Sequence, residues 1–458
     1  MPTATVASPQ RTGHPLDHIP GDDGWPIVGS TLTILRDPIG TAAANYRKYG
    51  PVYRSKVFGY RSVALLGPEA NELVLFDRDK VFASSGGWGP VLDLVFPRGL
   101  MLMDFDEHRM HRKALGVAFK PGPMKSYQGQ LDEGISRRVA EWHLAGSGQG
   151  SGTEMKFYPA IKQLTLDLAA TSFLGMGLND DALKINRAFV DMVAASIGVI
   201  RSPIRGSQMY RGVQGRKVIQ EVFGRLIPER RAGHGTDLFT ELCKATKEDG
   251  ALLTEPEIVD HMSFLMMAAH DTLTSSITSL VQLLAQNPEW QQKLRAEMQA
   301  LKLPRGAALP YERLGELELT EMAFKEAMRI NPPVPSIPRK AVKDFHFKGF
   351  DIPAGTRVAI NPLFTHRMAD VWPDPQRFDP LRFSDENVRQ RHKFAWVPFS
   401  GGAHMCLGLH FAYMQAKVFF YHLLTTSEIE MERGYAPAWA MWPIPKPRDG
   451  LAIRLRRI

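Results

Sequence analysis

Cysteine is almost absent from this chain of 458 residues, which contains only Cys243 and Cys406. Two thiols so far apart in the sequence can form one disulfide at most, so a disulfide framework does not organise the fold. Reduced thiols are typical of the cytoplasm, and we expect a cytoplasmic protein. A single disulfide or a zinc site using both cysteines stays open as an alternative, although no histidine spacing typical of zinc accompanies them.

Long hydrophobic runs are absent as well. Residues 1–26 contain no apolar stretch long enough for a secretory signal or a membrane-spanning helix, so we expect no transmembrane anchor. No internal repeat stands out, and the 39 glycines and 33 prolines are scattered along the chain. We therefore predict a flexible N-terminal tail over residues 1–18, followed by a single domain over residues 19–458.

Acidic residues are in the minority, because 48 Asp and Glu oppose 56 Lys and Arg, which gives a formal net charge of +8. Such a balance favours either solubility alone or a negatively charged partner. The basic residues are dispersed and no nucleic-acid-binding motif is present, so we expect no nucleic acid partner.

Helical patterns dominate what the chain does contain. The longest helix is predicted over residues 255–286, with Thr254 and Glu257 as a capping box and Asn287-Pro288 as the stop. Further helices are predicted near 314–330 and 407–424. Strands are predicted at 51–58 and 62–67, as a hairpin, and as short pieces around 341–360. Residues 84–103 are predicted to form an apolar loop and 367–394 an irregular meander, so the fold class is mainly α, a large helical part with a small β-rich part.

Cys406 lies in the segment FSGGAHMCLG, residues 399–408. Gly401, Gly402 and Gly408 suit a tight turn or the close approach of a flat ligand to the backbone. A helix is predicted to begin directly after the cysteine, where backbone N–H groups would stabilise a thiolate. This is an environment suited to a metal ligand, although a buried structural cysteine beside a glycine turn would have the same local pattern.

The whole segment resembles the haem-binding loop of the cytochrome P-450 family. The matching positions are Phe399, Gly402, His404, Cys406 and Gly408. The resemblance extends from about residue 19 to the C-terminus and implies haem b, with its iron held by the Cys406 thiolate. It also implies the fold of that family, with haem between the long helix and the cysteine loop.

Two more motifs resemble parts of the same family. Glu326 and Arg329 form E-x-x-R, and Arg382 lies in RFDPLRF, residues 377–383. E-x-x-R alone is most often an ion pair on a helix surface. The resemblance implies instead that the three residues form a buried structural network.

The long helix contains Ala268-Ala269-His270-Asp271-Thr272, which resembles the family's oxygen-activation motif. Taken alone, an Asp-Thr pair in a helix is more often a capping or packing pair. The resemblance implies that Thr272 and Asp271 are catalytic, the hydroxyl donating to dioxygen while the carboxylate supplies protons. It also implies that Ala268 lies against the haem, while Ala269 stands where the family usually has glycine.

Haem carries two propionates, which require cations and hydrogen-bond donors. By the resemblance, His108 and Arg112 in EHRMHRK bind them, together with Arg339 and His404. Each of these residues alone would more often be a solvated surface group.

Several large residues fall in segments that line the family's substrate pocket, and none of these residues is charged, so a bulky lipophilic molecule is expected. A steroid, a terpenoid or another polycyclic molecule is our first choice and a fatty acid the second. Core packing would explain the same residues. The pocket residues that the resemblance implies are Trp88, Val91, Leu92, Phe96, Phe264, Met267, Val334, Ile337, Trp439 and Met441.

The resemblance implies monooxygenation, in which one atom of O2 enters the substrate and the other leaves as water. Two cysteines are too few for an iron–sulfur cluster, so we expect electrons from NAD(P)H through a separate ferredoxin or flavodoxin and its reductase. A non-catalytic haem sensor and a peroxide-using or rearranging enzyme stay open as alternatives, and the intact Asp271-Thr272 pair argues against both. The basic residues expected to dock an acidic redox protein are Arg112, Lys113, Lys120, Arg389, Arg391 and Lys393.

Overall fold

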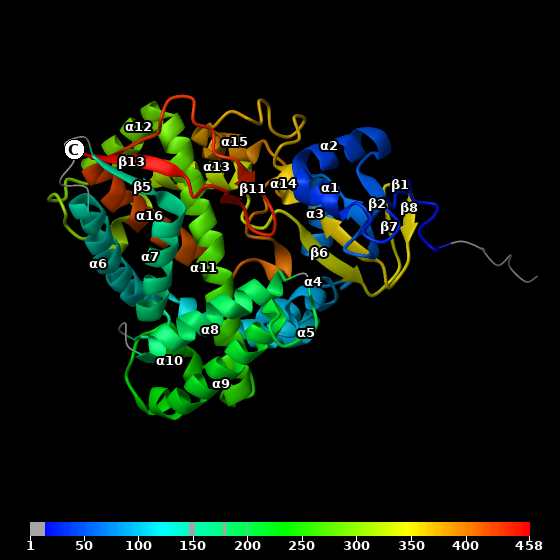
Figure 1. Ribbon diagram of the computed structural model, residues 1–458, viewed down its shortest axis with the longest axis horizontal. Helices are drawn as coiled ribbons and strands as arrows, with labels where there is room; N and C mark the ends of the chain where they lie inside the picture. The colour runs from blue at the N-terminus through cyan, green and yellow to red at the C-terminus, as the bar shows by residue number, and fades with distance from the viewer. Residues whose placement is uncertain (1–13, 146–151, 177–179, 199) are drawn as a thin grey trace, which may run out of the picture.

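Helices fill most of the molecule, and a mixed β-sheet occupies one end of it. The computed structural model describes residues 14–145, 152–176, 180–198 and 200–458. Figure 1 shows the helices on the left and below, and the largest sheet on the right beside α1, α2 and α3. The helices are α1 (Thr31–Arg36), α2 (Pro38–Tyr49), α3 (Pro68–Phe76), α4 (Ser85–Leu92), α5 (Phe105–Leu115), α6 (Pro121–Ala145), α7 (Phe157–Ser172), α8 (Asp180–Ser196), α9 (Gln208–Ala232), α10 (Leu238–Cys243), α11 (Glu255–Gln286), α12 (Pro288–Ala300), α13 (Glu318–Ile330), α14 (Pro362–Thr365), α15 (Asp385–Arg389) and α16 (Leu409–Thr426).

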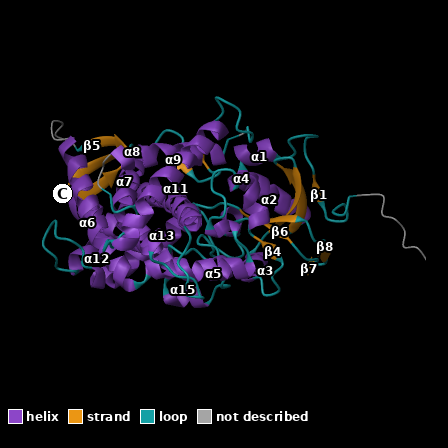
Figure 2. Ribbon diagram, turned by 90° about the horizontal axis from the view of Figure 1, so that it is seen from below, coloured by secondary structure: helices purple, strands orange, loops and turns teal. Residues whose placement is uncertain are grey.

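The central helix is α11, and its bounds are those predicted from the sequence. The Thr254 side chain accepts a hydrogen bond from the Glu257 N–H, and the Glu257 carboxylate accepts one from the Thr254 N–H at 2.7 Å, which confirms the capping box. At 1.5 Å per residue its 32 residues extend about 48 Å. The helix runs through the middle of the helical part in both ribbon views (Figures 1 and 2) and contacts α7, α9 and α13.

The strands form one large sheet and three small ones. The largest sheet has the order β1-β2-β3-β9-β6-β4, and the predicted hairpin is its β2–β3 pair, with Val52 opposite Leu65. A second sheet, β10-β13-β5, brings the C-terminal strand beside residues 153–156. The strands are β1 (Gly21–Asp22), β2 (Val52–Val57), β3 (Tyr60–Leu65), β4 (Phe82–Ala83), β5 (Thr153–Lys156), β6 (Ile337–Ala341), β7 (Phe345–Phe347), β8 (Phe350–Ile352), β9 (Arg357–Ile360), β10 (Ser427–Glu430), β11 (Trp439–Ala440), β12 (Lys446–Pro447) and β13 (Ala452–Arg457).

The two parts have separate hydrophobic cores. The larger core surrounds α11 and includes buried side chains of α6, α7, α13 and α16. The smaller core lies between the large sheet and α3. Residues 1–13 of the predicted tail lie outside the described residues, but Leu16 is only 3% exposed and packs in the smaller core, so the end of that tail is part of the fold.

The prediction of a loop over residues 84–103 is wrong in its first half. Residues 85–92 form α4, and a short 3₁₀ turn follows at Leu100–Leu102. A Cβ on Gly87 would lie 2.5 Å from the Pro338 carbonyl oxygen, so glycine lets α4 lie directly on β6. Glycine has a low intrinsic helix propensity, and in α4 the packing against the sheet compensates for it.

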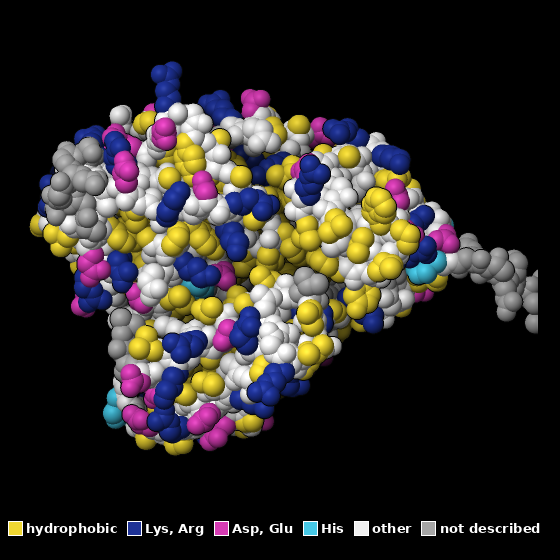
Figure 3. Space-filling view, in the orientation of Figure 1, with side chains coloured by type: hydrophobic (Ala, Val, Ile, Leu, Met, Phe, Trp, Pro, Cys, Tyr) yellow, Lys and Arg dark blue, Asp and Glu magenta, His cyan; other side chains and the backbone are white. Residues whose placement is uncertain are grey.

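Acidic and basic side chains alternate over the face drawn in Figure 3, with hydrophobic side chains gathered across its middle and right. This view agrees with the dispersed charge of the sequence. Among the described residues, no helix is both long enough and apolar enough to cross a bilayer.

Candidate active site

The cysteine segment forms a tight turn against α3. The Cys406 N–H donates to the Phe399 carbonyl at 2.8 Å, which closes the turn just before α16. Gly402 has a φ of +58°, and a Cβ there would lie 1.9 Å from the Leu75 carbonyl oxygen. Glycine at position 402 is therefore required by the backbone conformation and by its contact with α3. Gly408 is different, because a Cβ there would meet no protein atom within 4 Å.

Cys406 is the accessible one of the two thiols. Cys243 is buried, whereas Cys406 is exposed, and neither is in a disulfide. Enough protein surrounds Cys406 that desolvation raises the pKa of its thiol, while a hydrogen bond from Gly408 and the charge of Arg112 lower that pKa. The two features expected of a thiolate site, a backbone N–H donor and a nearby cation, are therefore both present at this sulfur.

Basic side chains from three segments, α5, β6 and the cysteine turn, converge near this thiol. The imidazole rings of His108 on α5 and His404 lie 3.8 Å apart. Desolvation, with the nearby positive charges, lowers the pKa of His108 to about 4 and that of His404 to about 2. Arg339 on β6 is only 4% exposed, and its pKa is lowered to about 10, mainly by burial.

In the part of the chain that the structure describes, the two arginines of this cluster, Arg112 and Arg339, have no close counter-ion. Among the described residues, neither Arg112 nor Arg339 has an ion pair within 4.0 Å, although Asp77 and Asp104 act on Arg339 from farther away. Buried positive charge without a close counter-ion suits an anionic ligand. A thiol beside such a cluster fits haem, whose iron takes the sulfur and whose two carboxylates take the cations.

The predicted ion network joins α13 to the segment that contains Arg382. Arg329 donates to both carboxylate oxygens of Glu326, at 2.6 and 2.8 Å, and both residues are 0% exposed. The Arg382 Nε lies 3.4 Å from the same carboxylate. Arg329 also donates to the His366 carbonyl at 2.9 Å and thereby ties α13 to the segment after α14.

The Asp271-Thr272 pair lies in an unbroken stretch of α11. The Thr272 hydroxyl donates to the Ala268 carbonyl at 2.7 Å. Asp271 makes contacts elsewhere, because its Oδ1 lies 3.2 Å from the Lys162 Nζ on α7 and 3.1 Å from the His270 Nδ1. Ala269 causes no break in the helix at this point.

The ten predicted pocket residues lie on separate segments. Three of them are on α4 and two on α11. Phe96 is buried beside Phe189 at a ring distance of 6.5 Å, and the Trp439 indole donates to Gln282, ten residues beyond Thr272 on α11. The first contact is within the larger core and the second is with α11. The assignment of the ten residues to a pocket stays a prediction.

Two features near the site could not be found from the sequence. Lys162 has no motif around it, and only packing of α7 on α11 brings it to Asp271. Arg201 donates to the Val91 carbonyl at 2.7 Å and to the carbonyls of Ala195 and Ser196, so it joins α4 to the end of α8. A local sequence pattern carries no signal for such contacts between distant segments.

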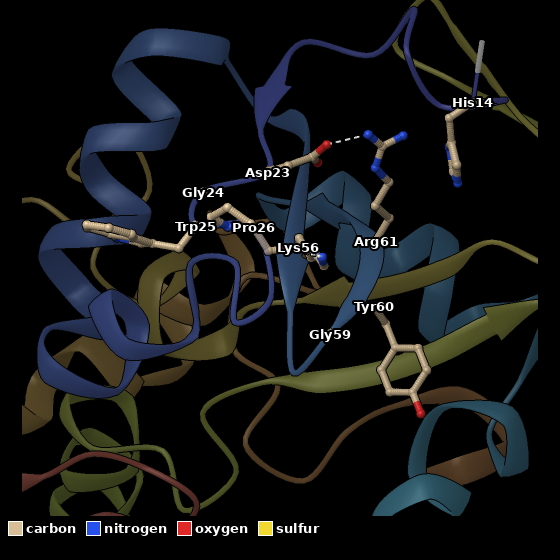
Figure 4. Close-up of a pocket in the computed structure, with 9 residues that line it drawn as sticks. All are labelled: His14, Asp23, Gly24, Trp25, Pro26, Lys56, Gly59, Tyr60 and Arg61. Atoms are coloured by element: carbon tan, nitrogen blue, oxygen red, sulfur yellow. Dashed lines mark hydrogen bonds and ion pairs between the residues drawn. The ribbon is translucent and has the colours of Figure 1, made fainter. Parts of the chain in front are cut away.

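A separate pocket of about 480 Å³ opens beside the β2–β3 hairpin (Figure 4). Asp23 and Arg61 lie in it and pair at 2.5 Å. It contains none of the predicted site residues and no thiol, so its chemistry does not match that of the Cys406 site.

Comparison with known proteins agrees with this geometry. A family model described as Cytochrome P450 matches residues 19–440. "Putative cytochrome P450 136" of Mycobacterium tuberculosis is 36% identical over 461 residues, covering 100% of this chain and 92% of that protein. "Taxane 10-beta-hydroxylase" of Taxus cuspidata is 28% identical over 452 residues, covering 95% and 89%. The solved structure "Retinoic acid bound cyanobacterial CYP120A1" superposes with a TM-score of 0.85 at 27% identity, covering 96% of this chain and 99% of that one.

Proposed function

Because this chain belongs to the cytochrome P450 family and is a haem-thiolate monooxygenase, we propose that it oxidises a lipophilic terpenoid with electrons from NAD(P)H. One oxygen atom of O2 enters the substrate and the other leaves as water. The observation that carries the proposal is the cluster of His108, Arg112, Arg339 and His404 beside the accessible Cys406 thiol. Such a cluster fits a dianionic, thiol-bound cofactor better than it fits any structural role.

The residues divide into two sets around the proposed haem. Cys406 would bind the iron. The guanidinium groups of Arg112 and Arg339 and the imidazole rings of His108 and His404 would bind the propionates. Haem b would supply the iron at which dioxygen is reduced. On the side of the haem that faces α11, the Thr272 hydroxyl would donate a hydrogen bond to dioxygen and the Asp271 carboxylate would supply protons. Ala268 precedes Thr272 by about one turn of the same helix.

Reduction of the protein under carbon monoxide tests the iron ligand. We expect the wild type to give the difference spectrum of a haem thiolate, and Cys406→Ser to lose it while keeping the same helix content by circular dichroism. The same spectrum in Cys406→Ser would contradict the assignment.

The substrate class rests on relatives and on the predicted lining. One relative is named for taxanes and one solved structure contains retinoic acid, and both of these compounds are isoprenoid. The ten predicted pocket residues are uncharged, which suits a bulky apolar skeleton.

A titration of the haem-loaded protein with retinoic acid, a taxane, a steroid and a fatty acid, followed by the haem spin shift, tests this choice. We expect the isoprenoids to bind at least about tenfold more tightly than the fatty acid. Burial of two additional CH₂-sized groups in the pocket would be enough to give this difference in affinity. Tighter binding of the fatty acid would overturn it.

We also propose that a separate ferredoxin or flavodoxin and its reductase deliver the electrons. The best candidates for docking are Lys120 and Lys393, which are exposed. Arg391 is a weaker candidate, because its guanidinium lies 3.9 Å from the centre of the Trp372 ring and donates to the Arg382 carbonyl. Lys113 is already paired with Glu248 at 3.1 Å.

Charge reversal tests the docking surface. Lys120→Glu and Lys393→Glu should slow reduction by an acidic ferredoxin at low salt and converge with the wild type at high salt, because salt screens the attraction. Lys184→Glu on α8 is the control. Equal rates for all three variants at low salt would exclude this surface.

The unpaired state of both cysteines supports a reducing, cytoplasmic location.

A further inference from the structure

Arg201 lies in the connection between α8 and α9, and its guanidinium contacts the ends of two helices. The Nη2 donates to the Val91 carbonyl of α4 at 2.7 Å, and the Nη1 donates to the carbonyls of Ala195 and Ser196 at 3.1 and 3.0 Å. These carbonyls belong to the last turns of α4 and α8, where the helix dipole favours a cation. The guanidinium is therefore held in place by backbone atoms of two helices.

The positive charge of this guanidinium is not neutralised by a carboxylate. Among the described residues, no acidic side chain lies within ion-pair distance of Arg201, and burial lowers its pKa without an acid to raise it. The nearest acidic residue along the chain is Asp191, which pairs with Arg211 at 3.8 Å. A partly buried guanidinium without a counter-ion favours an anionic ligand.

Part of the guanidinium remains free to bind such a ligand. Arginine has five N–H groups, and the Nε–H and one N–H of Nη2 in Arg201 make no hydrogen bond with any residue that the structure describes. Two N–H groups of one guanidinium can bind both oxygens of a carboxylate. Arg201 can therefore bind a carboxylate and keep its contacts with α4 and α8.

The surroundings of Arg201 suit a ligand that is both anionic and apolar. Residues 192–220 contain four arginines, one lysine and no acidic residue, so this segment attracts anions. The same connection exposes Ile197, Ile200 and Ile204, whose exposed fractions are 52%, 56% and 63%. Apolar side chains gathered in this way beside basic ones favour an apolar molecule that carries a negative group.

The helix α4 connects Arg201 with the arginine of the cysteine cluster. A Cβ on Gly87 would lie 2.7 Å from the Arg339 backbone nitrogen, so the first half of α4 packs on the strand that carries Arg339. Val91, in the last turn, accepts the hydrogen bond from Arg201. The eight residues of α4 extend about 12 Å. Arg201 therefore lies at the end of α4 that is farther from the residues around Cys406.

We propose that the substrate is a lipophilic carboxylate and that Arg201 is a specificity-determining residue, which binds the substrate carboxylate at the end of α4. The inference rests on the proposed function and adds the charge of the substrate to it. The carboxylate is not consumed in the reaction. A C–H bond elsewhere in the molecule breaks, and substrate R–H, O2, two electrons and two protons give R–OH and water.

The test compares an acid with the alcohol of the same skeleton. Retinoic acid and retinol are titrated into the haem-loaded wild type, and binding is followed by the haem spin shift. A carboxylic acid of ordinary pKa is ionised at neutral pH, whereas the alcohol is not. The shared hydrocarbon cancels in the ratio of the two dissociation constants. We expect retinoic acid to bind at least about tenfold more tightly, the usual contribution of a hydrogen bond to a charged group, and equal affinities would overturn the proposal.

Variants of two arginines separate binding of the carboxylate from a structural role. Arg201→Gln keeps donors for the helix carbonyls but loses the charge, and we expect it to bind retinoic acid about tenfold more weakly and retinol as the wild type does. Arg201→Lys should recover part of the loss, because it restores the charge but not the planar pair of donors. An equal loss for both probes in Arg201→Gln would show that Arg201 only holds the helices together, and it would refute the proposal.

Arg211→Gln is the matched control, since it removes the same charge from the same acid-free segment. We expect its ratio of retinoic acid to retinol affinity to equal that of the wild type. The same fall in the ratio for Arg211→Gln and Arg201→Gln would assign the effect to the general positive field and exclude a specific contact with Arg201.

A second skeleton distinguishes this inference from the proposed function. Dodecanoic acid and dodecanol are compared in the same four proteins. Tighter binding of dodecanoic acid that depends on Arg201, without a spin shift from either retinoid, would reject the isoprenoid substrate and support the carboxylate site. Equal, tight binding of both retinoids would support the isoprenoid substrate and reject the carboxylate site. A normal carbon monoxide spectrum without a spin shift from any of these compounds would reject both.

Discussion

Glu326→Gln removes the charge from a carboxylate that accepts hydrogen bonds from two groups and lies close to a third. Arg329 contacts both of its oxygens, Arg382 lies 3.4 Å from one, and the Asp379 N–H donates to that same oxygen at 3.0 Å. Glutamine keeps the shape but turns an N–H₂ group toward the guanidinium groups. Because Glu326 and Arg329 are 0% exposed, the arginine would keep a buried charge with no compensating anion.

We expect Glu326→Gln to lower the free energy of unfolding by about 3–5 kcal/mol, the range found when one partner of a buried ion pair is removed. Burial raises the pKa of Glu326 even beside Arg329, so desolvation is the larger influence on this carboxylate. Arg329→Met should cost a similar amount. The double variant should cost less than the sum of the two, because the residues act on each other directly.

Urea unfolding of the haem-loaded protein, followed by tryptophan fluorescence and haem absorbance together, measures these losses. The control is Arg137→Gln, which removes an exposed pair with Glu133 at 3.9 Å and should change stability by less than about 0.5 kcal/mol. A loss below about 1 kcal/mol in Glu326→Gln, or a loss equal to that of the control, would refute the argument from burial. The haem content should also fall in Glu326→Gln, because α13 packs against α16, which follows the cysteine turn.

Three shorter predictions address the turn, the pH response and the pocket. Gly402→Ala should prevent stable folding of the cysteine turn, because its Cβ would overlap the Leu75 carbonyl. Gly408→Ala is the control and should leave the thermal stability of the haem-free protein unchanged. Equal melting temperatures for the two variants would contradict this prediction. Burial lowers the pKa of His261 to about 3, so below about pH 6.5 the unfolded state takes up a proton that the folded state refuses. Stability should therefore fall by up to about 1.4 kcal/mol per pH unit as the pH drops from about 6.5, and a His261→Leu variant with an unchanged slope in acid unfolding would argue against it. Trp88→Ala should weaken retinoic acid binding in the spin-shift titration by about tenfold or more, the worth of one buried large apolar side chain, and an unchanged affinity would remove Trp88 from the pocket.

The sequence by itself determined the elements whose stability is local. The bounds of α11 follow from a capping box and a proline stop, and the hairpin follows from two alternating apolar runs around a turn. The cysteine segment could be identified in the same way, because the Cys406 N–H closes onto the Phe399 carbonyl within the segment itself. The contact of Gly402 with Leu75 on α3, in contrast, is not local. Local patterns of this kind are free-energy preferences that do not depend on distant parts of the chain.

Only the tertiary structure decided what each charged group contacts. The helix α4 forms despite its glycines because β6 supports it. The lysine that holds Asp271 lies on α7, at a position 108 residues before His270, and no local pattern predicts it. The packing of the helices determines which charged side chains lie close together, and the low dielectric of the interior strengthens the interaction between them. For this reason the position of the thiol was evident from the sequence, whereas the pairing of Lys162 with Asp271 was not.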